Sequence, residues 1–522
     1  MVQIFKVGSK LKKKKIILDF IKLEKIIKTI RAKNKKIVLC HGVFDLFHFG
    51  HLEYFSAAKK YGDILIASIT EDNFINKGPG RPVFKSFERL KILEALEIVD
   101  YVVISRSVTS EKLIKLIKPD IYAKGPDYKN HKNDVTSNIL KEVNLVKRYG
   151  GKTIYTNEET KSSSEIINKN HIGNFDPKVI SLKKEIRKKL NYKKLILDIE
   201  KFKKLKVLVI GETIIDNYIF CEAIGKSGKE PHLVLKDQYS EEYMGGVIAI
   251  AKHLETFCKK VTIATALGEN HKFYYSKILK HLDKNVHFKY FEKQGAPTIL
   301  KKRYIDYLTK NKLLGIYSFN DRDLSKVEIK KYQKLIFNQI KNYDLILISD
   351  YGHGIINNKL ANKLCNAASN KIFLNAQLNA ANFGHHTLLK YKKFNSLIIN
   401  ESELRHEMRD RYSKIENLIK TFSRKINLAT LLLTRGTQGS ILYKKKLNRF
   451  YYCPALANNV VDKVGGGDAM LSLAALSLKL KLDPLTVLLT SSIAASVVVE
   501  SIGNSKSVKK KDLLKSLQYF CK

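Results

Sequence analysis

Two histidines, His48 and His51, flank Gly50 in the stretch "HGVFDLFHFGH". The stretch follows the apolar run "KIVLC" and precedes "LEYFSAAKKYG", which has helical spacing. We therefore place the histidines at the turn from a strand into a helix, where open parallel sheets bind ligands. Backbone N–H groups at a helix start attract phosphate, and two imidazoles at this spacing can donate to one phosphate group. A phosphate-handling loop is the favoured interpretation. A zinc pair would need further ligands, and none occurs at suitable spacing, whereas two unrelated core histidines stay an open alternative.

A second candidate for phosphate chemistry is "VVDKVGGGDAMLSLAALSL". Its three glycines, Gly465, Gly466 and Gly467, precede Asp468 and an apolar helix. A glycine turn at a helix N-terminus gathers N–H groups around a transferring phosphoryl group. A carboxylate at the same point can accept the proton of an attacking hydroxyl. An ordinary glycine-rich helix start is the alternative.

Strands alternate with helices in two series along the 522 residues. In the first, the predicted strands are "KIVLCHG", "DILIASIT", "DYVVIS" and "DIYAKG"; the second begins at "KVLVIGETIIDNY" and includes "DLILISDYGHG", "KIFLNAQ", "FNSLIIN" and "LATLLLTRG". Such alternation is typical of parallel, doubly wound sheets, and the length suits two domains. We predict an α/β protein with an N-terminal segment 1–33, a domain 34–170, a charge-rich helical linker 171–205 and a domain 206–522.

Two further segments bear on membrane contact. Residues 11–31 are rich in lysine and carry an apolar stripe that predicts one amphipathic helix, which could lie on a membrane or, as we favour, pack on the domain that follows. The stripe consists of Ile16, Phe20, Leu23, Ile27 and Ile30. The segment "PLTVLLTSSIAASVVV" is shorter than the ~20 residues of an unaided membrane span and predicts a buried helix. Six scattered cysteines and the lack of a signal-peptide core indicate a cytoplasmic protein with reduced thiols and no membrane span.

The formal net charge of +45 raises the question of nucleic-acid binding. The lysines are spread along the whole chain, and no zinc-finger, RRM-like or helix-turn-helix signature accompanies them. We therefore expect no specific nucleic-acid partner. A role of the basic surface in nucleic-acid binding stays an alternative, and anionic small substrates would also benefit from the positive field.

The first domain resembles the nucleotidyltransferase superfamily with the HxGH signature, which includes cytidylyltransferases and adenylyltransferases. The segments "NKGPGRPV", "ERLKILEALEIVDYVV", "PDIYAKGPDY" and "KSSSEIINK" follow in order and most resemble the nucleotidyltransferase half of the bifunctional heptose kinase/adenylyltransferases of lipopolysaccharide-core synthesis. The resemblance implies a Rossmann-like, HUP-type fold and transfer of a nucleotidyl group from ATP or CTP to a sugar phosphate, with release of pyrophosphate. His48 and His51 would stabilise the transition state at the α-phosphate.

The same resemblance implies further binding residues in the first domain. Those expected at the nucleotide or its phosphates are Gly42, Phe44, Gly50, Lys77, Arg81, Lys124, Ser162, Ser163 and Ser164. Asp127 is expected to bind the substrate, and Asp45 to order the turn. Alternatively, Lys77 and Arg81 lie in a solvated basic loop, and the serines only cap a helix.

The second domain resembles the ribokinase/phosphofructokinase-B family, whose D-x-V-G-x-G-D signature matches "VVDKVGGGD". The resemblance implies a ribokinase-like fold, with Asp468 as the catalytic base and Gly465, Gly466 and Gly467 as the anion hole. "GETIIDNY" resembles the opening G-D-x-x-x-D and implies Asp216 at the sugar hydroxyls. The other implied binding residues are Gly245 and Gly246 of "MGGVIAIA", Asn400 and Glu403 of "NESE", and Thr434 and Gly436 of "TRGTQG". Mg²⁺ is expected to be held by nucleotide phosphates and water, near Glu403, without a direct protein cage.

Four departures from the kinase pattern leave the kinase substrate open. Glu212 replaces the first aspartate of the opening motif, Ala249 stands where heptose kinases have a sugar-binding asparagine, and Lys463 replaces a common threonine. "FLNAQLNAANFG" replaces a segment that usually carries Asp-Pro-Lys. The order of the two domains is also the reverse of that in the known bifunctional heptose enzyme. Loss of hydrogen-bonding groups to a substrate changes specificity strongly.

The sequence as a whole predicts a bifunctional enzyme of nucleotide-sugar synthesis. It would combine a sugar kinase, with a heptose phosphate as the expected substrate, and a sugar-phosphate nucleotidyltransferase. The expected partners are ATP or CTP and sugar phosphates, and a homodimer is expected because both families often dimerise. The alternative is a nucleotidyltransferase joined to a catalytically silent, kinase-like binding domain.

Overall fold

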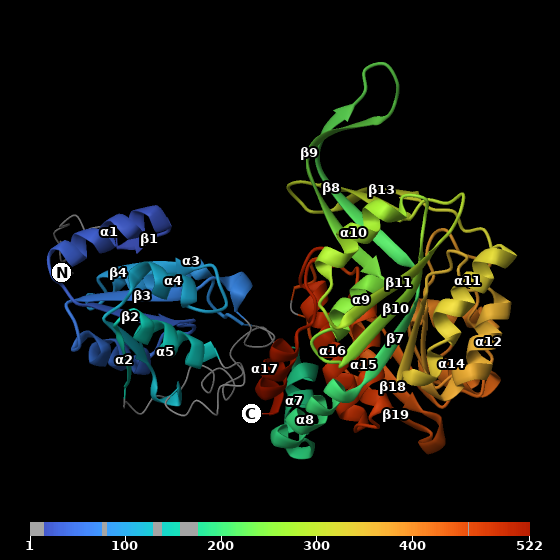
Figure 1. Cartoon of the computed structure of the whole chain (residues 1–522). Coiled ribbons are helices and arrows are strands. Elements are labelled where there is room, and N and C mark those ends of the chain that lie inside the picture. The colour runs from blue at the N-terminus through green and yellow to red at the C-terminus, as the bar shows by residue number, and fades with distance from the viewer. Residues whose placement is uncertain (1–14, 76–80, 129–137, 157–175, 458, 522) are drawn as a thin grey trace, which may run out of the picture. The chain divides into compact units, whose positions relative to one another are not determined.

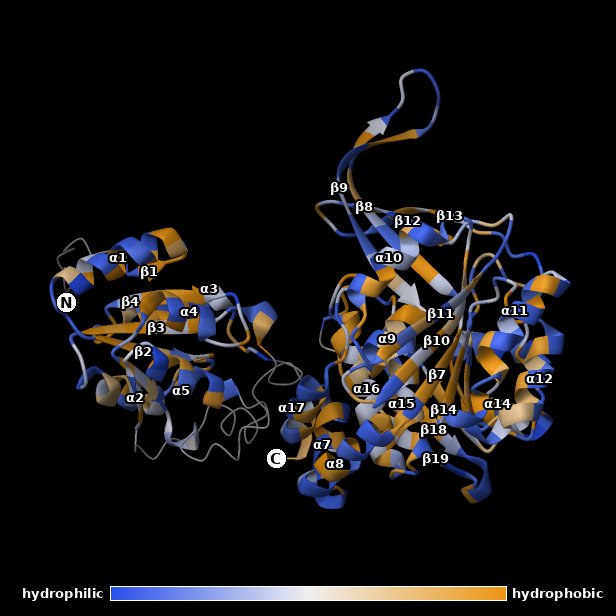
Figure 2. Cartoon of the chain, in the orientation of Figure 1, coloured by the Kyte–Doolittle hydropathy of each residue, from blue (hydrophilic) through white to orange (hydrophobic). Residues whose placement is uncertain are grey.

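The chain forms two compact units, residues 1–180 and 181–522, in a computed structural model (Figure 1). The structure describes residues 15–75, 81–128, 138–156, 176–457 and 459–521. Apolar residues concentrate on the central strands of each unit, and polar residues dominate the outer faces of the helices (Figure 2). Each unit therefore has a core of its own.

The first unit is a six-stranded parallel sheet in the order β1-β4-β3-β2-β5-β6. Its strands are β1 (Ile16–Ile17), β2 (Ile37–Gly42), β3 (Ile64–Thr70), β4 (Tyr101–Ser105), β5 (Ile121–Lys124) and β6 (Lys152–Tyr155), and its helices are α1 (Phe20–Ala32), α2 (Phe49–Lys59), α3 (Ser86–Ala95), α4 (Glu111–Ile117) and α5 (Asn138–Arg148). Alternate residues of β2 enter two separate cores: Val38 lies in one, and Ile37 and Leu39 in the other. A strand buried on both faces reads as a continuous apolar run, which explains the composition of "KIVLC".

The prediction of one helix over residues 11–31 is wrong at its start. Ile16 and Ile17 form β1, which pairs in parallel with β4, and α1 begins only at Phe20. Asp19 is the N-cap of α1, and its carboxylate accepts the N–H of Ile21 at 2.9 Å, so the polypeptide leaves the strand and enters the helix at this residue. The predicted packing is confirmed for three of the four stripe residues in α1, which are buried in the core shared with β2, whereas Phe20 at the start of the helix is exposed. The buried members are Leu23, Ile27 and Ile30.

The second unit is built on a nine-stranded sheet in the order β11-β10-β7-β14-β15-β16-β17-β18-β19. The strands are β7 (Lys206–Gly211), β10 (Lys260–Leu267), β11 (Val286–Glu292), β14 (Leu345–Asp350), β15 (Ile372–Ala376), β16 (Ser396–Asn400), β17 (Thr430–Thr434), β18 (Ser440–Lys444) and β19 (Arg449–Cys453). All pairs from β11 to β17 are parallel, and β18 and β19 complete the sheet in antiparallel fashion. Because seven strands are parallel neighbours, their carboxyl ends meet at one edge of the sheet, where the loops can form a site.

Helices surround the nine-stranded sheet. They are α9 (Val247–Leu254), α10 (His271–His281), α11 (Lys326–Phe337), α12 (Asn358–Ala368), α13 (Glu401–Met408), α14 (Ile415–Lys425), α15 (Gly466–Lys479), α16 (Pro484–Val499) and α17 (Lys510–Cys521). The predicted buried helix is confirmed as α16, whose residues are buried on nearly all sides. Among the described residues, no helix combines the length and the apolar character that crossing a membrane requires.

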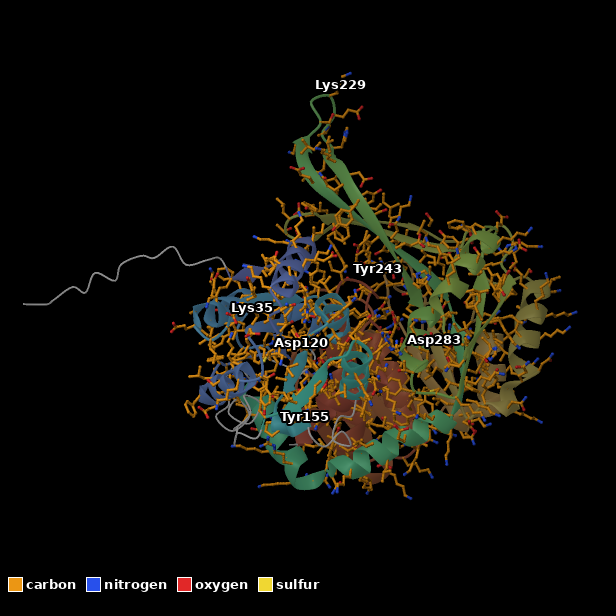
Figure 3. All side chains as sticks on the ribbon, turned by 60° about the vertical axis from the view of Figure 1, so that its left-hand side comes forward. Lys35, Asp120, Tyr155, Lys229, Tyr243 and Asp283 are labelled. Atoms are coloured by element: carbon orange, nitrogen blue, oxygen red, sulfur yellow. The ribbon has the colours of Figure 1, made fainter. Side chains whose placement is uncertain are left out.

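A four-stranded sheet, in the order β13-β12-β8-β9, lies beside the main sheet of the second unit. Its strands are β8 (Thr213–Lys226), β9 (Leu233–Gly246), β12 (Ile299–Asp306) and β13 (Lys312–Ser318). The inner half of β8 is buried and its outer residues are exposed, so the β8–β9 hairpin extends beyond the sheet, with Lys229 at its tip (Figure 3). β8 follows β7 directly, which brings the inner part of the small sheet to the carboxyl edge of the large one.

Two helices precede β7, namely α7 (Pro177–Lys189) and α8 (Tyr192–Glu200). The Tyr192 hydroxyl donates to the carbonyl of Leu514 at 3.3 Å, and Lys510 forms an ion pair with Glu200. The ammonium of Lys183 lies 3.7 Å from the ring centroid of Tyr519. These contacts attach α8 and the later part of α7 to the C-terminal helix α17.

Candidate active sites

The first candidate site lies at the carboxyl end of β2. This strand has β3 on one side and β5 on the other, so it marks the point at which the strand order reverses. Ligands of open parallel sheets bind in the crevice at such a point. The loop between β2 and α2 contains Phe44 and Leu46 with positive φ angles of 49° and 47°, which side-chain-bearing residues adopt at a cost. Gly42 ends β2, and a Cβ there would lie 3.1 Å from the ring of Phe44.

The two histidines form the start of α2. His48 is the N-cap, its Nδ1 accepts the N–H of Gly50 at 3.1 Å, and Nδ1 of His51 faces the N–H of His48 at 3.4 Å. The rings stack with centroids 4.1 Å apart. Partial burial lowers the pKa of His48, which favours the neutral imidazole. With Nδ1 acting as an acceptor, neutral His48 carries its proton on Nε2 and can donate from that atom.

Asp45 holds the β2–α2 loop against residues 81–84. Its carboxylate accepts the N–H groups of Val83 and Phe84 at 2.9 to 3.0 Å and pairs with a guanidinium nitrogen of Arg81 at 3.3 Å. Both side chains of this ion pair are buried. The structure therefore places Arg81 beneath the loop as an anchor, and Asp45 orders the turn as expected.

Of the other binding residues predicted for this unit, Lys124 and Asp127 lie at and just after the end of β5. Lys124 ends β5, its ammonium lies 3.4 Å from a carboxylate oxygen of Glu142, and it is buried. Asp127 lies in the short helical turn Pro126–Tyr128 that follows. Lys77, Ser162, Ser163 and Ser164 lie outside the described residues.

The second candidate site is centred on Asp468 in the first turn of α15. Gly465 is the N-cap with φ of +82°, and a Cβ there would lie 2.1 Å from Oδ1 of Asn504. A Cβ on Gly467 would meet open space. The first N–H groups of a helix have no partner inside it, so Gly466 and Gly467 can offer theirs to an anion.

The Asp468 carboxylate is buried and accepts two side-chain hydrogen bonds. The Tyr351 hydroxyl donates to Oδ1 at 2.8 Å, and the Gln377 amide donates to the same atom at 3.3 Å. Burial raises the pKa of Asp468 to about 7, against the effect of the hydrogen bond from Tyr351. A carboxylate with a pKa near neutrality is suited to accept a proton as a general base.

Tyr351 is held in place from both sides of its backbone. The buried Glu212 accepts the N–H groups of Tyr351 and His353 at 2.9 and 3.1 Å. The amides of Asn379 and Asn382 donate to the carbonyl of Tyr351 at 2.7 and 2.9 Å. Glu212 and the "QLNAAN" segment, two of the departures from the kinase pattern, therefore support the residue that contacts Asp468.

Asp216 lies on β8 and is buried beside basic residues of β12. It forms an ion pair with Arg303, and Lys301 is its direct neighbour across the parallel strands. Burial lowers the pKa of Lys301, while the charge of Asp216 opposes this effect. A Cβ on Gly245 would lie 2.6 Å from Oδ2 of Asp216, so this glycine leaves room for the carboxylate. Gly246, with φ of +59°, ends β9 and caps α9.

Asn400 and Glu403 form a reciprocal cap at the start of α13. The Asn400 side chain accepts the N–H of Glu403 at 2.8 Å, and Oε2 of Glu403 accepts the N–H of Asn400 at 2.8 Å. The other oxygen of Glu403 accepts the N–H of Leu378 at 3.3 Å. Burial raises the pKa of Glu403 to about 7. Thr434 ends β17, and Gly436 begins the next turn with φ of +56°.

The structure thus gathers the predicted kinase residues at one edge of the sheet. It also adds three side chains that the sequence reasoning did not assign, namely Tyr351, Gln377 and Lys301. Tyr351 and Lys301 lie in segments that resemble the kinase pattern, and Gln377 lies in a segment that departs from it. The sequence of these segments alone does not reveal a contact with Asp468 or Asp216. Two departures make no polar side-chain contact among the described residues: Ala249 is buried in α9, and Lys463 is exposed.

Comparisons with known proteins agree with this division of the chain. Residues 204–511 match the pfkB family carbohydrate kinases, and residues 39–169 match the cytidylyltransferase-like family. The predicted order, a cytidylyltransferase-like domain followed by a ribokinase-like kinase domain, is confirmed.

Two curated relatives are similar to about a quarter of the chain. The bifunctional protein HldE of Nitratiruptor sp. is 44% identical over 139 residues, which are 26% of this chain and 30% of that protein. HldE of Helicobacter pylori is 40% identical over 149 residues, which are 28% of this chain and 30% of that protein. The chain therefore spans less than a third of the length of these relatives.

A solved structure resembles the second unit. Phosphofructokinase-2 of Escherichia coli, in complex with substrates and products, is 12% identical with a TM-score of 0.50. The match covers 61% of this chain and 100% of that protein. At this identity the similarity shows the fold alone.

Proposed function

The chain belongs to the pfkB family of carbohydrate kinases through residues 204–511, and we propose that it is a bifunctional transferase of nucleotide-sugar synthesis. Its second unit would phosphorylate a sugar or sugar phosphate from ATP. Its first unit would transfer a nucleotidyl group from ATP or CTP to a sugar phosphate. The observation that carries the kinase assignment is the buried Asp468 carboxylate, which has a raised pKa, accepts a hydrogen bond from Tyr351 and lies at a glycine-rich helix start.

In the kinase step, Asp468 accepts the proton of the sugar hydroxyl while the hydroxyl oxygen forms a bond to the γ-phosphorus. The bond between that phosphorus and the bridging oxygen breaks, and ADP leaves. The N–H groups of Gly466 and Gly467 stabilise the charge on the transferring group. Asp216, whose carboxylate lies in the room that Gly245 leaves, would accept hydrogen bonds from the sugar.

Magnesium fits this site as an ion held mainly by nucleotide phosphates and water. The oxygens of Glu403 already accept backbone N–H groups, and no set of three His, Cys, Asp or Glu side chains among the described residues is placed to hold a metal ion. Glu403 would thus act near the ion through water. When bound, Mg²⁺ would neutralise phosphate charge.

In the nucleotidyl step, a phosphate oxygen of the sugar phosphate attacks the α-phosphorus of the nucleoside triphosphate. The bond from this phosphorus to the bridging oxygen breaks, and pyrophosphate leaves. His48, with its proton on Nε2, and His51, stacked on it, would donate hydrogen bonds to the phosphate oxygens as charge develops. Asp45 and Arg81 keep the loop in the conformation that presents these rings.

A heptose phosphate is the sugar substrate that we propose. The support is the similarity of the first unit to the bifunctional proteins HldE, which covers 30% of their length. We further propose that the protein acts in the cytoplasm as a homodimer, with nucleotides and sugar phosphates as its partners.

A second candidate function is a nucleotidyltransferase with a silent, kinase-like binding unit. The buried Ala249 favours it, since this side chain offers no hydrogen bond to a sugar. The contacts of Glu212, Asn379 and Asn382 with Tyr351 oppose it, because they hold the backbone of the residue whose hydroxyl contacts Asp468.

Separate measurement of ADP and pyrophosphate release, on a panel of sugars and sugar phosphates with ATP and then CTP, tests both functions. We expect His48→Ala to lower pyrophosphate release at least about 100-fold, and Asp468→Ala to lower ADP release by as much, since one acid–base or charge-stabilising group contributes ~10² or more. Each variant should leave the other activity intact. The exposed residues His232 and Asp323 provide matched controls, His232→Ala and Asp323→Ala.

The outcomes separate the candidates. Pyrophosphate release without ADP release on every sugar would support the silent kinase-like unit. If His48→Ala kept pyrophosphate release within a few-fold of the parent, the assignment of the first site would be wrong.

A further inference from the structure

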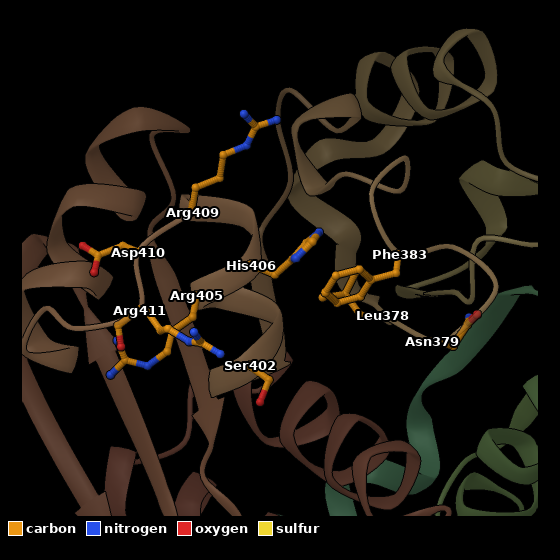
Figure 4. A pocket seen from close by; sticks show the side chains of 9 residues that line it. All are labelled: Leu378, Asn379, Phe383, Ser402, Arg405, His406, Arg409, Asp410 and Arg411. Atoms are coloured by element: carbon orange, nitrogen blue, oxygen red, sulfur yellow. The ribbon is translucent and has the colours of Figure 1, made fainter.

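An open pocket of about 500 Å³ lies beside α13 in the second unit (Figure 4). We call it the arginine pocket. Its lining residues are Leu378, Asn379, Phe383, Ser402, Arg405, His406, Arg409, Asp410 and Arg411. Pockets of this size bind small organic ligands. None of these residues is among those assigned above to the sugar, to the nucleotide or to the proton transfer, so the proposed function leaves the pocket without a ligand.

The side chains that line the arginine pocket carry a net positive charge, which suits an anionic ligand. Three guanidinium groups line it against one carboxylate. That carboxylate, Asp410, accepts the N–H groups of Tyr412 and Ser413 at 3.1 and 2.9 Å and is thus engaged within its own turn. Arg409 and Arg411 form no side-chain hydrogen bond or ion pair with any described residue.

Unlike Arg409 and Arg411, Arg405 is engaged in bonds within the protein. It pairs with Glu401 at 2.8 Å and donates to the carbonyls of Arg411 and Ser413 at 3.2 Å. These bonds fix the turn that carries Arg411. Two guanidinium groups on an ordered backbone are therefore available to a ligand, and guanidinium groups bind phosphate oxygens in bidentate fashion.

The other end of the pocket is aromatic. Phe383 is 65% exposed, and its ring lies against His406 with centroids 4.4 Å apart. Figure 4 shows these two rings together at one end and the side chains of Arg405, Asp410 and Arg411 together at the other. A planar ring on the ligand would cover the apolar face that Phe383 leaves in water. The two ends thus match a ring joined to a phosphate.

We propose that the arginine pocket binds a nucleoside phosphate, with its base against Phe383 and its phosphate on Arg411. Figure 4 shows the exposed Arg409 side chain extending away from Arg411, so Arg409 must turn toward the phosphate to become its second guanidinium contact. This site is additional to the catalytic nucleotide site. It lies next to the active site along the chain, because Leu378, which lines the pocket, donates to Glu403, and Gln377 donates to Asp468. A binding test must therefore report on the pocket itself.

The chain contains no tryptophan, so Phe383→Trp in the full-length protein places a single fluorophore in the pocket. We would titrate this variant at low salt with ADP, CMP, ribose 5-phosphate and inorganic phosphate. The expected result is quenching by ADP and CMP at concentrations at least about tenfold lower than ribose 5-phosphate or inorganic phosphate requires, since base stacking on an aromatic ring is worth ~1–3 kcal/mol. Added salt should weaken binding, because exposed charges are screened.

A charge-removal series gives the control. In the Phe383→Trp background, Arg409→Ala with Arg411→Ala should weaken ADP binding at least about tenfold, because hydrogen bonds to charged groups contribute ~1.5–3 kcal/mol each. Lys425→Ala with Arg424→Ala removes two exposed charges from α14 and should leave binding unchanged. An unchanged melting temperature establishes that each variant folds.

Three outcomes would overturn the proposal. One is the absence of quenching by any nucleotide. Another is binding of inorganic phosphate as tight as that of ADP, which would remove the role of the base. The third is quenching that persists after loss of Arg409 and Arg411, which would assign the signal to the catalytic site.

Discussion

At the scale of single residues, the kinase site is distinguished by buried carboxyl groups. Burial raises the pKa values of Glu212, Glu403 and Asp468 to about 7 each, and the Asp350 charge adds to the effect on Glu212. Each group costs stability when it ionises in the folded protein, because the charged form loses its hydration. Among the three, only Asp468 accepts hydrogen bonds from side chains on two different loops, which suits a group that must lose and regain a proton in a fixed position.

Tyr351→Phe is expected to move the acid limb of the kinase pH–rate profile upward. The Tyr351 hydroxyl stabilises the ionised form of Asp468, so its removal raises the pKa of Asp468 further and leaves less of this proposed base ionised at neutral pH. A hydrogen bond to a charged group contributes ~1.5–3 kcal/mol, which corresponds to a shift of about one pH unit or more. The measurement is kcat for ADP release from about pH 5 to about pH 9.

Tyr332→Phe is the matched control for this change. Tyr332 is also buried, but its hydroxyl donates to the carbonyl of Ala264 at 3.1 Å and not to Asp468. The Tyr332→Phe variant should therefore have the same acid limb as the parent. An acid limb that does not move in Tyr351→Phe would show that Tyr351 does not tune the base.

Glu403→Gln should stabilise the second unit relative to the parent increasingly as the pH rises. Glu403 has a folded-state pKa of about 7, above its ordinary value of 4.5, so its stabilising protonation is complete at low pH and is lost as the pH rises through about 7. Glutamine has no such loss. The difference in unfolding free energy, variant minus parent, should therefore grow between about pH 5 and about pH 8, by at most ~1.4 kcal/mol per unit. Urea titrations at the two pH values measure it, and a constant difference would contradict the raised pKa.

The candidate site was predictable from sequence only in part, and the missing part has a physical reason. The glycines before Asp468 carry a local signal, because a glycine-rich helix start is a property of adjacent residues. The contact between Tyr351 and Asp468 joins residues 117 positions apart and depends on how two loops end at one edge of the sheet. No spacing along the chain encodes it.

At the scale of elements, the continuous apolar strands were the clearest signal and the boundaries the weakest. The four residues after Lys36, "IVLC", are all apolar because β2 is buried on both faces. The error at residues 11–31 arose because Ile16 fits the helical stripe, whereas Asp19 starts the helix and leaves Ile16 and Ile17 to pair with β4. A helical period alone does not locate an N-cap.

Leu23→Ala in α1 should destabilise the first unit by ~2–5 kcal/mol, the usual cost of a cavity in a core. Leu23 is fully buried, whereas Ile21 in the same helix is 68% exposed. Ile21→Ala is therefore the matched control and should change stability by less than ~0.5 kcal/mol. Hydrogen exchange of amides in β2 and β3 measures the stability of this unit specifically. Equal effects of the two changes would contradict the packing of α1.

At the scale of the whole molecule, the dominant feature is charge. The chain has 95 lysine and arginine residues against 50 aspartate and glutamate residues, and they are spread over both units. Several basic groups contribute instead to structure: Arg81 pairs with Asp45, Arg303 with Asp216 and Lys390 with Asp350. The remaining surplus of basic residues creates a positive field that attracts anions.

This distribution of charge predicts binding to duplex DNA that depends on salt and ignores sequence. Contacts to phosphates release counterions, so a protein that makes 6–10 of them loses ~10³–10⁵ in affinity between about 50 and about 200 mM salt. Fluorescence anisotropy with two unrelated duplexes of equal length measures the effect, and we expect the two affinities to agree within a few-fold at each salt concentration. The arginine-pocket variant, Arg409→Ala with Arg411→Ala, should change these affinities only slightly, because it removes two charges from a surplus of 45.

A preference of about tenfold for one duplex that survived ~200 mM salt would instead indicate base contacts, because phosphate contacts carry no sequence information. Nucleic acid would then be a specific partner, and the interpretation of the positive surface as a general field would be wrong.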